Sequence, residues 1–268
     1  MSNNILVNEQ FGFCDNVSTG SAIFKIIKSI FNAWNNKEHI IGLFCDLTKA
    51  FDSISHELLI LKLDFYGVKG CILNWLKSYL HNRKQRVVLQ FVSSPNLLSE
   101  WEIVRHGAPQ GSVLGPLLFH VCINDFSCII NEISHTILFA DDTNILIHFS
   151  DLNELNSKLN SVLFCISKWF QNNQLVLNLN KTHIVKFSSS KLLTYPLNTV
   201  YNNQALTVTE NIKFLGMRLN CSLTWKSLID NLIKKKKTEF SLLHVEKIIT
   251  LCKCKSVTYG LFCTFLFT

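Results

Sequence analysis

Two adjacent carboxylates interrupt the apolar stretch Thr136-Ile-Leu-Phe-Ala-Asp-Asp-Thr-Asn-Ile-Leu-Ile-His-Phe149. The runs on either side, Thr136 to Ala140 and Asn144 to Phe149, are typical of β-strands, so the residues between them predict a tight hairpin. Such a hairpin holds Asp141 and Asp142 close to a hydrophobic sheet, where like charges repel and lose hydration unless a cation neutralises them. Because Mg²⁺ binds a few carboxylates together with substrate phosphates, the stretch indicates a divalent-metal site.

A third carboxylate ends another apolar strand. The continuous run from Ile40 to Cys45 predicts a strand buried on both faces, and Asp46 follows it directly. Asp is also a common turn residue, so either position alone is equally well explained by local structure. Taken together, the three carboxylates suggest a shared site in which two metal ions stabilise the attacking and leaving oxygens of a phosphoryl transfer.

Composition narrows the class of protein. Of 268 residues, 48% are hydrophobic and 17% are charged, which excludes intrinsic disorder. Lys and Arg number 26 against 19 Asp and Glu, and this net charge of +7 is compatible with a polyanionic partner. The ten cysteines contain no Cys-x-x-Cys pair, which favours reduced, buried thiols over zinc ligands. With no secretory leader and no apolar run of about 20 residues, we expect an intracellular protein of the nucleus or cytoplasm, neither secreted nor membrane-embedded.

Several other segments have the periodicity of helices or strands. A helix that carries Leu58 to Leu63 is expected to be capped by Asp52 or Ser53 and to end at Gly67. The order of elements predicts a mixed sheet with helices on one side. The remaining expected helices are Ala22–Trp34, Cys71–Leu80, Leu117–Asn124 and Leu152–Gln171, with a helical tail from Trp225. The remaining expected strands are Val87–Val92, Trp101–Val104, His183–Phe187 and Ile212–Leu219, with a weak hairpin around Asn202 and Asn203.

Three motifs occur in a fixed order. They are Phe44-Cys-Asp-Leu-Thr-Lys-Ala-Phe-Asp52, then Gly107-Ala-Pro-Gln-Gly-Ser-Val-Leu-Gly-Pro-Leu-Leu-Phe119, then Phe139-Ala-Asp-Asp142. In order and spacing they resemble the palm motifs of reverse transcriptases, above all those of non-LTR (LINE-type, jockey-like) retrotransposons. The similarity runs from Gln10-Phe-Gly-Phe13 to Phe214-Leu-Gly216.

The resemblance implies an α+β, right-hand polymerase fold. An antiparallel palm sheet would carry helices on one face, with partial fingers over residues 1–35, a palm with a fingers insertion over 36–220 and a partial thumb over 221–268. The activity implied is RNA-directed DNA synthesis from an RNA template and a DNA primer with deoxynucleoside triphosphates. Two Mg²⁺ ions, or Mn²⁺ in their place, would serve as cofactors. The oligomeric state is left open.

The same resemblance implies roles at the reacting centre. Asp46 and Asp141 would bind both metals, with Asp142 beside them. Phe51 would lie under the sugar of the incoming nucleotide and clash with a 2′-hydroxyl, although it also fits as one more buried Phe. Lys181, in Leu-Asn-Leu-Asn-Lys-Thr, would lie near the pyrophosphate leaving group, although a lone Lys is often simply solvated.

Further residues are implied to contact the substrates. Gln110 and Gly111 would touch the nucleotide and the template base, although a helix-entry turn explains part of this loop. The hairpin at Phe214, Leu215 and Gly216 would grip the primer end. Phosphate contacts are expected from a basic stretch that contains Arg83, Lys84 and Arg86, and from Lys77 and the Lys234–Lys237 run.

Some features depart from the family. Cys14 comes after Gln10-Phe-Gly-Phe13 where LINE-type enzymes usually carry an Arg, and a thiol cannot replace a guanidinium on phosphate. An upstream fingers segment, an endonuclease domain and most of the family's chain beyond the thumb are expected to be missing, as in a fragment or a degenerate copy. The alternative function is therefore a catalytically inactive, retrotransposon-derived protein that binds nucleic acid.

Overall fold

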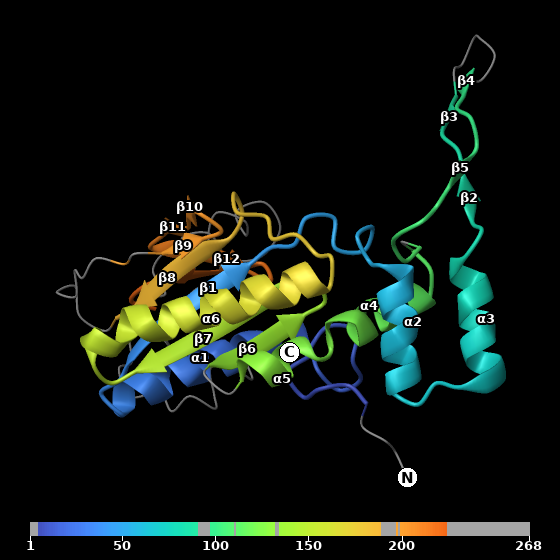
Figure 1. The fold of residues 1–268 in the computed structure, drawn as a ribbon. Coiled ribbons are helices and arrows are strands. Elements are labelled where there is room, and N and C mark those ends of the chain that lie inside the picture. The colour runs from blue at the N-terminus through green and yellow to red at the C-terminus, as the bar shows by residue number, and fades with distance from the viewer. Residues whose placement is uncertain are drawn as a thin grey trace, which may run out of the picture.

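A five-stranded sheet forms the body of the molecule (Figure 1). The computed structural model describes residues 5–90, 97–109, 111–131, 134–188, 197 and 199–223. The strand order is β11-β8-β1-β7-β6, and all neighbours are antiparallel except β11 and β8. The expected antiparallel palm sheet is thus confirmed. Its strands are β1 (His39–Cys45), β6 (His135–Phe139), β7 (Asp142–Phe149), β8 (His183–Phe187) and β11 (Thr207–Val208).

The central strand β1 is buried on both faces, as its continuous apolar run predicts. Ile41, Leu43 and Cys45 belong to one hydrophobic cluster, whereas Ile40 and Phe44 belong to the other. This alternation results from the two-residue period of a strand. A strand that is apolar on both faces needs a covering layer on each side.

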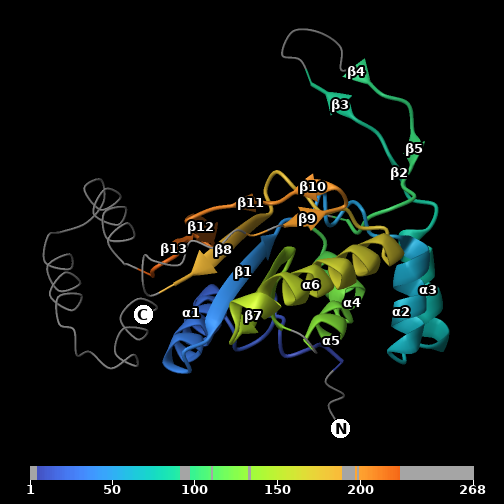
Figure 2. The ribbon, with the colours of Figure 1, turned by 60° about the vertical axis from the view of Figure 1, so that its left-hand side comes forward.

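Helices cover both faces of the sheet (Figure 2), which corrects the expectation of helices on one side. The helix α1 (Thr19–Asn35) covers the face of Ile40 and Phe44. It begins at Ser18, whose side chain and that of Ser21 form a capping box. On the opposite face, α6 (Leu152–Asn172) packs on β7 and α5 (Phe126–Ile130) packs on β6. Three more helices belong to the same hydrophobic cluster, and of these α2 (His56–Phe65) packs against α3 (Gly70–Leu80) and α4 (Leu114–Ile123).

The long helix α6 shows how the sequence pattern sets the packing. Asp151 caps it by accepting a hydrogen bond from the Asn153 amide, which satisfies one of the free N–H groups at the helix start. Its buried residues recur every three or four positions and face the sheet. They are Leu155, Leu159, Val162, Leu163, Ile166, Trp169 and Phe170, and the predicted boundaries hold to within one residue.

An arm extends from the helices α2 and α3 (Figures 1 and 2). It consists of four two-residue strands, β2 (Lys84–Gln85), β3 (Val88–Leu89), β4 (Leu97–Leu98) and β5 (Glu102–Ile103), paired β2–β5 and β3–β4. The predicted strands at 87–92 and 101–104 are therefore too long within the described residues. Every residue in these four strands is exposed, so no buried face sustains a longer ladder.

Two small hairpins lie beside the sheet. The predicted hairpin at Asn202 and Asn203 is confirmed, with both residues at positive φ between β9 (Val200–Tyr201) and β10 (Gln204–Ala205). The predicted strand at 212–219 is instead a hairpin of β12 (Asn211–Phe214) and β13 (Met217–Asn220). Leu215 and Gly216 both have positive φ, 45° and 85°, which turns the chain back on itself.

The start of α2, the cysteines and the C-terminal tail also bear on the sequence expectations. Helix α2 begins after Ser55, not after Asp52 or Ser53, because the amides of both residues bond to the Lys49 carbonyl in a preceding turn. All seven described cysteines are free thiols, as expected. In the described part of the chain no helix is both long and apolar enough to cross a membrane. The predicted helical tail from Trp225 and the Lys234–Lys237 run lie outside the described residues.

Candidate active site

Asp46 lies at one end of the sheet, with Asp142 on one side and Lys181 on the other. Cys45 pairs with Thr143 on β7, and Phe44 pairs with His183 on β8. In an antiparallel pair, one more residue along the first ladder brings Asp46 opposite Asp142. The second ladder ends at His183, and Lys181 lies in the turn just before β8. Strand pairing and this turn together bring the three side chains, from distant parts of the sequence, to one end of the sheet.

The turn between β6 and β7 presents the other carboxylate. Phe139 pairs with Asp142, so Ala140 and Asp141 form a two-residue turn. Ala140 has a φ of 54°, a conformation that costs a non-glycine residue roughly 1 kcal/mol or more. Ala140 is buried, whereas Asp141 is exposed at the tip. Strained backbone of this kind concentrates at functional sites.

The three carboxylates interact electrostatically. Burial, and after it the negative charges of Asp141 and Asp46, together raise the pKa of Asp142 to about 6. This mutual repulsion is what the sequence predicts for carboxylates gathered at strand ends without a cation.

Lys181 supplies a positive charge to this end of the sheet. Its Nζ lies 3.7 Å from Oδ2 of Asp46, and its side chain is 68% exposed. The loop before β8 holds Asp46 by its backbone, since the Asn178 amide donates to the Asp46 carbonyl at 2.8 Å. The Asp46 amide in turn donates to Oγ1 of Thr182 at 3.3 Å. Lys181 is thus fixed beside the carboxylates by the segment that contains it.

The donor chemistry at this site suits a hard divalent cation, because the three candidate ligands are carboxylates and their repulsion is relieved by positive charge. As the side chains stand, no group of three or more His, Cys, Asp and Glu among the described residues is arranged to hold a metal ion. Because Asp141 is exposed at the tip of its turn, its carboxylate has room to reorient.

The segment Gln10-Phe-Gly-Phe13 braces the carboxylate turn, a role that sequence reasoning missed. Oε1 of Gln10 accepts hydrogen bonds from the amides of Gly12 at 2.8 Å and Ala140 at 3.1 Å. Phe11 donates its amide to the Leu138 carbonyl at 2.8 Å. A Cβ on Gly12 would lie 2.4 Å from the Ala140 nitrogen, closer than real contacts allow. The only signal in the sequence was the Gly between two Phe, which does not reveal its neighbour 128 positions away.

Phe51 lies in a turn that is joined to the loop after Gly107. Its ring stacks on Phe119 with centroids 4.8 Å apart, and the residue is half-buried against the core. The Phe51 carbonyl accepts from the Ala108 amide at 2.8 Å. Gly111 is exposed with a φ of 77°, whereas Gln110 lies outside the described residues.

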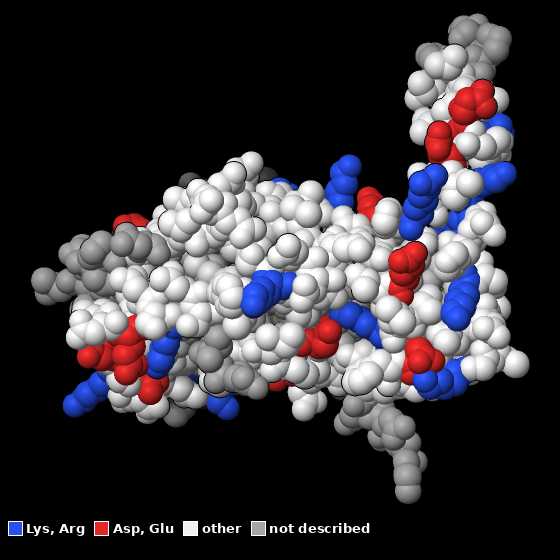
Figure 3. Space-filling view, in the orientation of Figure 1, with Lys and Arg blue, Asp and Glu red and all other residues white. Residues whose placement is uncertain are grey.

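The predicted nucleic-acid contacts fall in two places. Arg83, Lys84 and Arg86 lie in and beside β2, where the arm begins. Figure 3 shows Lys and Arg side chains along the arm. The turn of the β12–β13 hairpin presents Leu215 and Gly216. Phe214 is buried, with its ring 6.1 Å from that of Phe44, so its side chain supports the hairpin from below.

Comparison with known proteins identifies similar sequences. The family model described as "Reverse transcriptase (RNA-dependent DNA polymerase)" matches residues 1–219. A probable RNA-directed DNA polymerase from transposon BS of Drosophila melanogaster is 31% identical over 233 residues, covering 82% of this chain and 24% of the relative. The RNA-directed DNA polymerase from mobile element jockey of the same species is 28% identical over 229 residues, covering 83% and 24%. The chain thus spans about a quarter of the length of these curated relatives.

Solved structures share the fold at low sequence identity. Apo telomerase from Candida tropicalis, truncated from its C-terminal domain, matches with a TM-score of 0.52 and 13% identity over 81% of this chain and 40% of that chain. Telomerase from Candida albicans in complex with a telomeric RNA fragment matches with a TM-score of 0.52 and 13% identity, over 84% and 39%. These similarities support the right-hand polymerase fold that the motifs predict.

Proposed function

Because this chain belongs to the reverse transcriptase (RNA-dependent DNA polymerase) family, in the branch of non-LTR, jockey-like retrotransposons, we propose that it extends a DNA primer on an RNA template. The observation that carries the proposal is that Asp46 lies opposite Asp142 in the strand register and 3.7 Å from Lys181. That arrangement provides negative charge for binding cations and a positive charge for a phosphate group at the same place.

The residues that would hold the metals are Asp46 and Asp141, with Asp142 beside them. Mg²⁺, or Mn²⁺ in its place, supplies when bound a counter-charge for both the attacking and leaving oxygens of the transferred phosphoryl group. The raised pKa of Asp142 supports this assignment, since burial first and the neighbouring charges of Asp141 and Asp46 next disfavour its ionised form, which a bound cation would stabilise.

Lys181 and Phe51 would act on the incoming nucleotide. The Lys181 ammonium, 3.7 Å from Asp46, is suited to neutralise the pyrophosphate leaving group or donate a proton to it. The ring of Phe51, held against Phe119, would exclude a 2′-hydroxyl and so favour deoxynucleotides. Gln110 and Gly111 would touch the nucleotide and template base.

The remaining assignments concern partners and organisation. Leu215 and Gly216 would contact the primer end, and Arg83, Lys84 and Arg86 the phosphates of the template–primer duplex. We assign residues 1–35 to partial fingers, 36–220 to the palm with its fingers insertion and 221–268 to a partial thumb. Since template and nucleotides are intracellular, we expect the protein in the nucleus or cytoplasm.

Primer extension tests the proposed function. The chain is incubated with poly(rA), oligo(dT) and dTTP in Mg²⁺, beside Asp141→Asn and the matched control Asp64→Asn, whose carboxylate pairs with Lys69 on the surface. We expect Asp141→Asn to lose at least about 10²-fold of the rate, because several kcal/mol of charge stabilisation are removed. The control should keep the wild-type rate. Equal rates in wild type and Asp141→Asn would refute the proposal.

A second candidate is a nucleic-acid-binding protein without catalysis. Cys14 favours it, because burial and then the neighbouring Asp15 raise the pKa of the thiol and keep it uncharged where the family usually carries an Arg. The same assay separates the two functions. Duplex binding without any extension above the Asp141→Asn background would support the second.

A further inference from the structure

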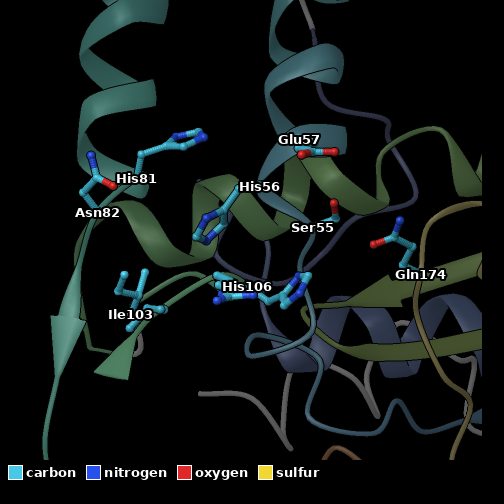
Figure 4. A pocket seen from close by; sticks show the side chains of 10 residues that line it. Ser55, His56, Glu57, His81, Asn82, Ile103, His106 and Gln174 are labelled. Carbon is cyan, nitrogen blue, oxygen red and sulfur yellow. The ribbon is translucent and has the colours of Figure 1, made fainter. Parts of the chain in front are cut away.

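A cavity of about 460 Å³ lies at the base of the arm, and its lining does not include Asp46, Asp141 or Asp142 (Figure 4). It is formed where α2 begins, where α3 ends and where the chain returns from β5 toward Gly107. Its lining residues are Ser55, His56, Glu57, His81, Asn82, Ile103, Val104, Arg105, His106 and Gln174. Nothing in the proposed catalytic step uses these side chains.

Three imidazoles and one guanidinium line the cavity. The rings of His56 and His81 have centroids 6.1 Å apart, and His106 and Arg105 complete the group. The side chains of the three histidines lie together in Figure 4, whereas the one carboxylate of the lining, Glu57, lies toward Ser55 in that view. Burial lowers the pKa of His56, and positive charge on His81, His106 and Arg83 lowers it further, against a hydrogen bond that raises it. Burial and the neighbouring side chains therefore favour the neutral form of His56, and Arg105 supplies a positive charge to the lining.

His56 is oriented so that it can gain a donor toward the cavity. Nε2 lies 2.8 Å from the carbonyl oxygen of Gly107, and because a carbonyl can only accept, Nε2 carries the proton. Nδ1 of the neutral ring is then an acceptor, and it becomes a donor when the ring is protonated. An anion in the cavity would be bound together with a proton.

We propose that this cavity binds a phosphodiester group of a nucleic-acid strand that passes the base of the arm. The proposal rests on the proposed function for its partner, since it names a further point at which that partner is held. The groups that face His56 are His81, His106, Arg83 and Arg105 as positive or protonatable side chains and Glu57 as the single acid of the lining.

A ladder of flat side chains beside the cavity favours a nucleic-acid strand over free phosphate. Trp75 and Tyr79, one turn apart on α3, stack at 5.8 Å with 19° between their planes, and the guanidinium of Arg83 lies 5.8 Å from the Tyr79 ring. Trp75 is 55% exposed. The helix then runs directly into His81 and Asn82, which line the cavity. Exposed aromatic faces bind bases and basic grooves bind the backbone, which is how proteins hold single strands.

Binding of labelled oligonucleotides tests the proposal. The full chain is titrated against fluorescent 20-nucleotide single-stranded RNA and DNA without divalent ions, at pH 6 and pH 8, by anisotropy. The variant His81→Gln/His106→Gln changes two exposed residues. We expect it to weaken binding about three- to tenfold at pH 6 and less at pH 8. The slope of log affinity against log salt should fall by about 0.7 for each phosphate that the variant no longer neutralises.

Matched controls separate this site from general charge. Lys25→Gln/Lys28→Gln, on the exposed side of α1, should bind like wild type, and so should Asp64→Asn, whose carboxylate pairs with Lys69 on the surface. Arg105→Gln provides a second exposed probe of the cavity should the double variant unfold. Competition by inorganic phosphate, and an oligonucleotide with uncharged methylphosphonate linkages, tell a strand from a free phosphate.

The outcomes decide the proposal independently of polymerase activity. Weaker binding by the cavity variants and by the methylphosphonate strand, with both controls unchanged, supports it whether or not primer extension is seen. Equal binding by wild type and the folded cavity variants overturns it, as does a loss no larger than that of the α1 control. Displacement of the strand by inorganic phosphate at micromolar concentration would also overturn it, because the occupant would then be a small anion.

Discussion

The carboxylate end of the sheet and the arm contrast in how their residues are positioned. At the sheet, strands of five to eight residues with both faces covered fix the register, and the register determines which side chains meet. On the arm, two-residue strands leave apolar side chains such as Val87 and Leu97 63% exposed. Burial therefore fixes the geometry of the palm. The arm instead presents its basic and aromatic side chains on a surface that no second layer of the protein covers in the part of the chain that the structure describes.

The largest expected difference between the two regions is in stability. Phe149 is fully buried in β7, so Phe149→Ala should lower the free energy of unfolding by about 3–5 kcal/mol. Trp101, 55% exposed on the arm over Arg86, should cost about 1 kcal/mol or less when changed to Ala. Urea denaturation followed by circular dichroism measures both. Similar losses from the two changes would mean that the arm is packed as firmly as the sheet.

Changes in the segment Gln10–Phe13, which braces the turn of Ala140 and Asp141, should have the next largest effect on stability and on primer extension. Gly12→Ala places a methyl group against the Ala140 nitrogen, which should destabilise the fold by about 1–3 kcal/mol and slow primer extension by about 10²-fold. Gln10→Met removes the acceptor for the Ala140 amide and should also slow extension, whereas Gln10→Glu keeps an acceptor and should retain more activity.

Gln171→Met, on the exposed side of α6, is the matched control for the change at Gln10. Wild-type extension rates in both Gly12→Ala and Gln10→Met would show that the turn holds its shape without this brace.

A smaller effect is expected at Phe51, beside the loop after Gly107, and it concerns the choice between ribonucleotides and deoxynucleotides. Phe51→Val should raise incorporation of ribonucleotides relative to deoxynucleotides by about tenfold, a difference of about 1.4 kcal/mol. The ratio is the readout, because loss of the stack on Phe119 alone would slow both substrates equally. An unchanged ratio would mean that Phe51 only packs.

The smallest expected effect is on the pH dependence of the folding stability. Burial lowers the pKa of His120, so the folded chain binds fewer protons than the unfolded chain below about pH 6.5. Stability is then present above that pH and is lost as pH falls through it. Melting temperatures from pH 7.5 to 5.5 should fall less steeply in His120→Phe than in wild type. Parallel slopes would contradict a neutral buried imidazole.

The central strands of the sheet could be predicted from the sequence because each is a continuous apolar run, as expected of a buried strand. The apolar run before Asp46 and the two runs around Asp141 allow few arrangements, and all three strands form where expected. Lys181 was assigned only through the family resemblance, and its contact with Asp46 depends on β8 pairing with β1 across 135 residues. Local periodicity carries no information on such pairings.

Other features were missed because they depend on contacts between distant segments. That α1 covers the second face is consistent with the two-sided burial of β1, yet the helix pattern gives no side of the sheet. Gln10 reads as one polar residue among many until the Ala140 amide is beside it. The arm was predicted as longer strands because Val and Leu favour strands, although no face of it is buried there.

Iron-directed cleavage tests the central claim, that three strand ends form one metal site. Fe²⁺ is bound in place of Mg²⁺, and with ascorbate and peroxide it cuts the chain near the bound ion. We expect cuts near Asp46, near Asp141 and near Lys181, suppressed by excess Mg²⁺ and absent in Asp141→Asn. Cuts confined to one of these segments, or unchanged in Asp141→Asn, would contradict it.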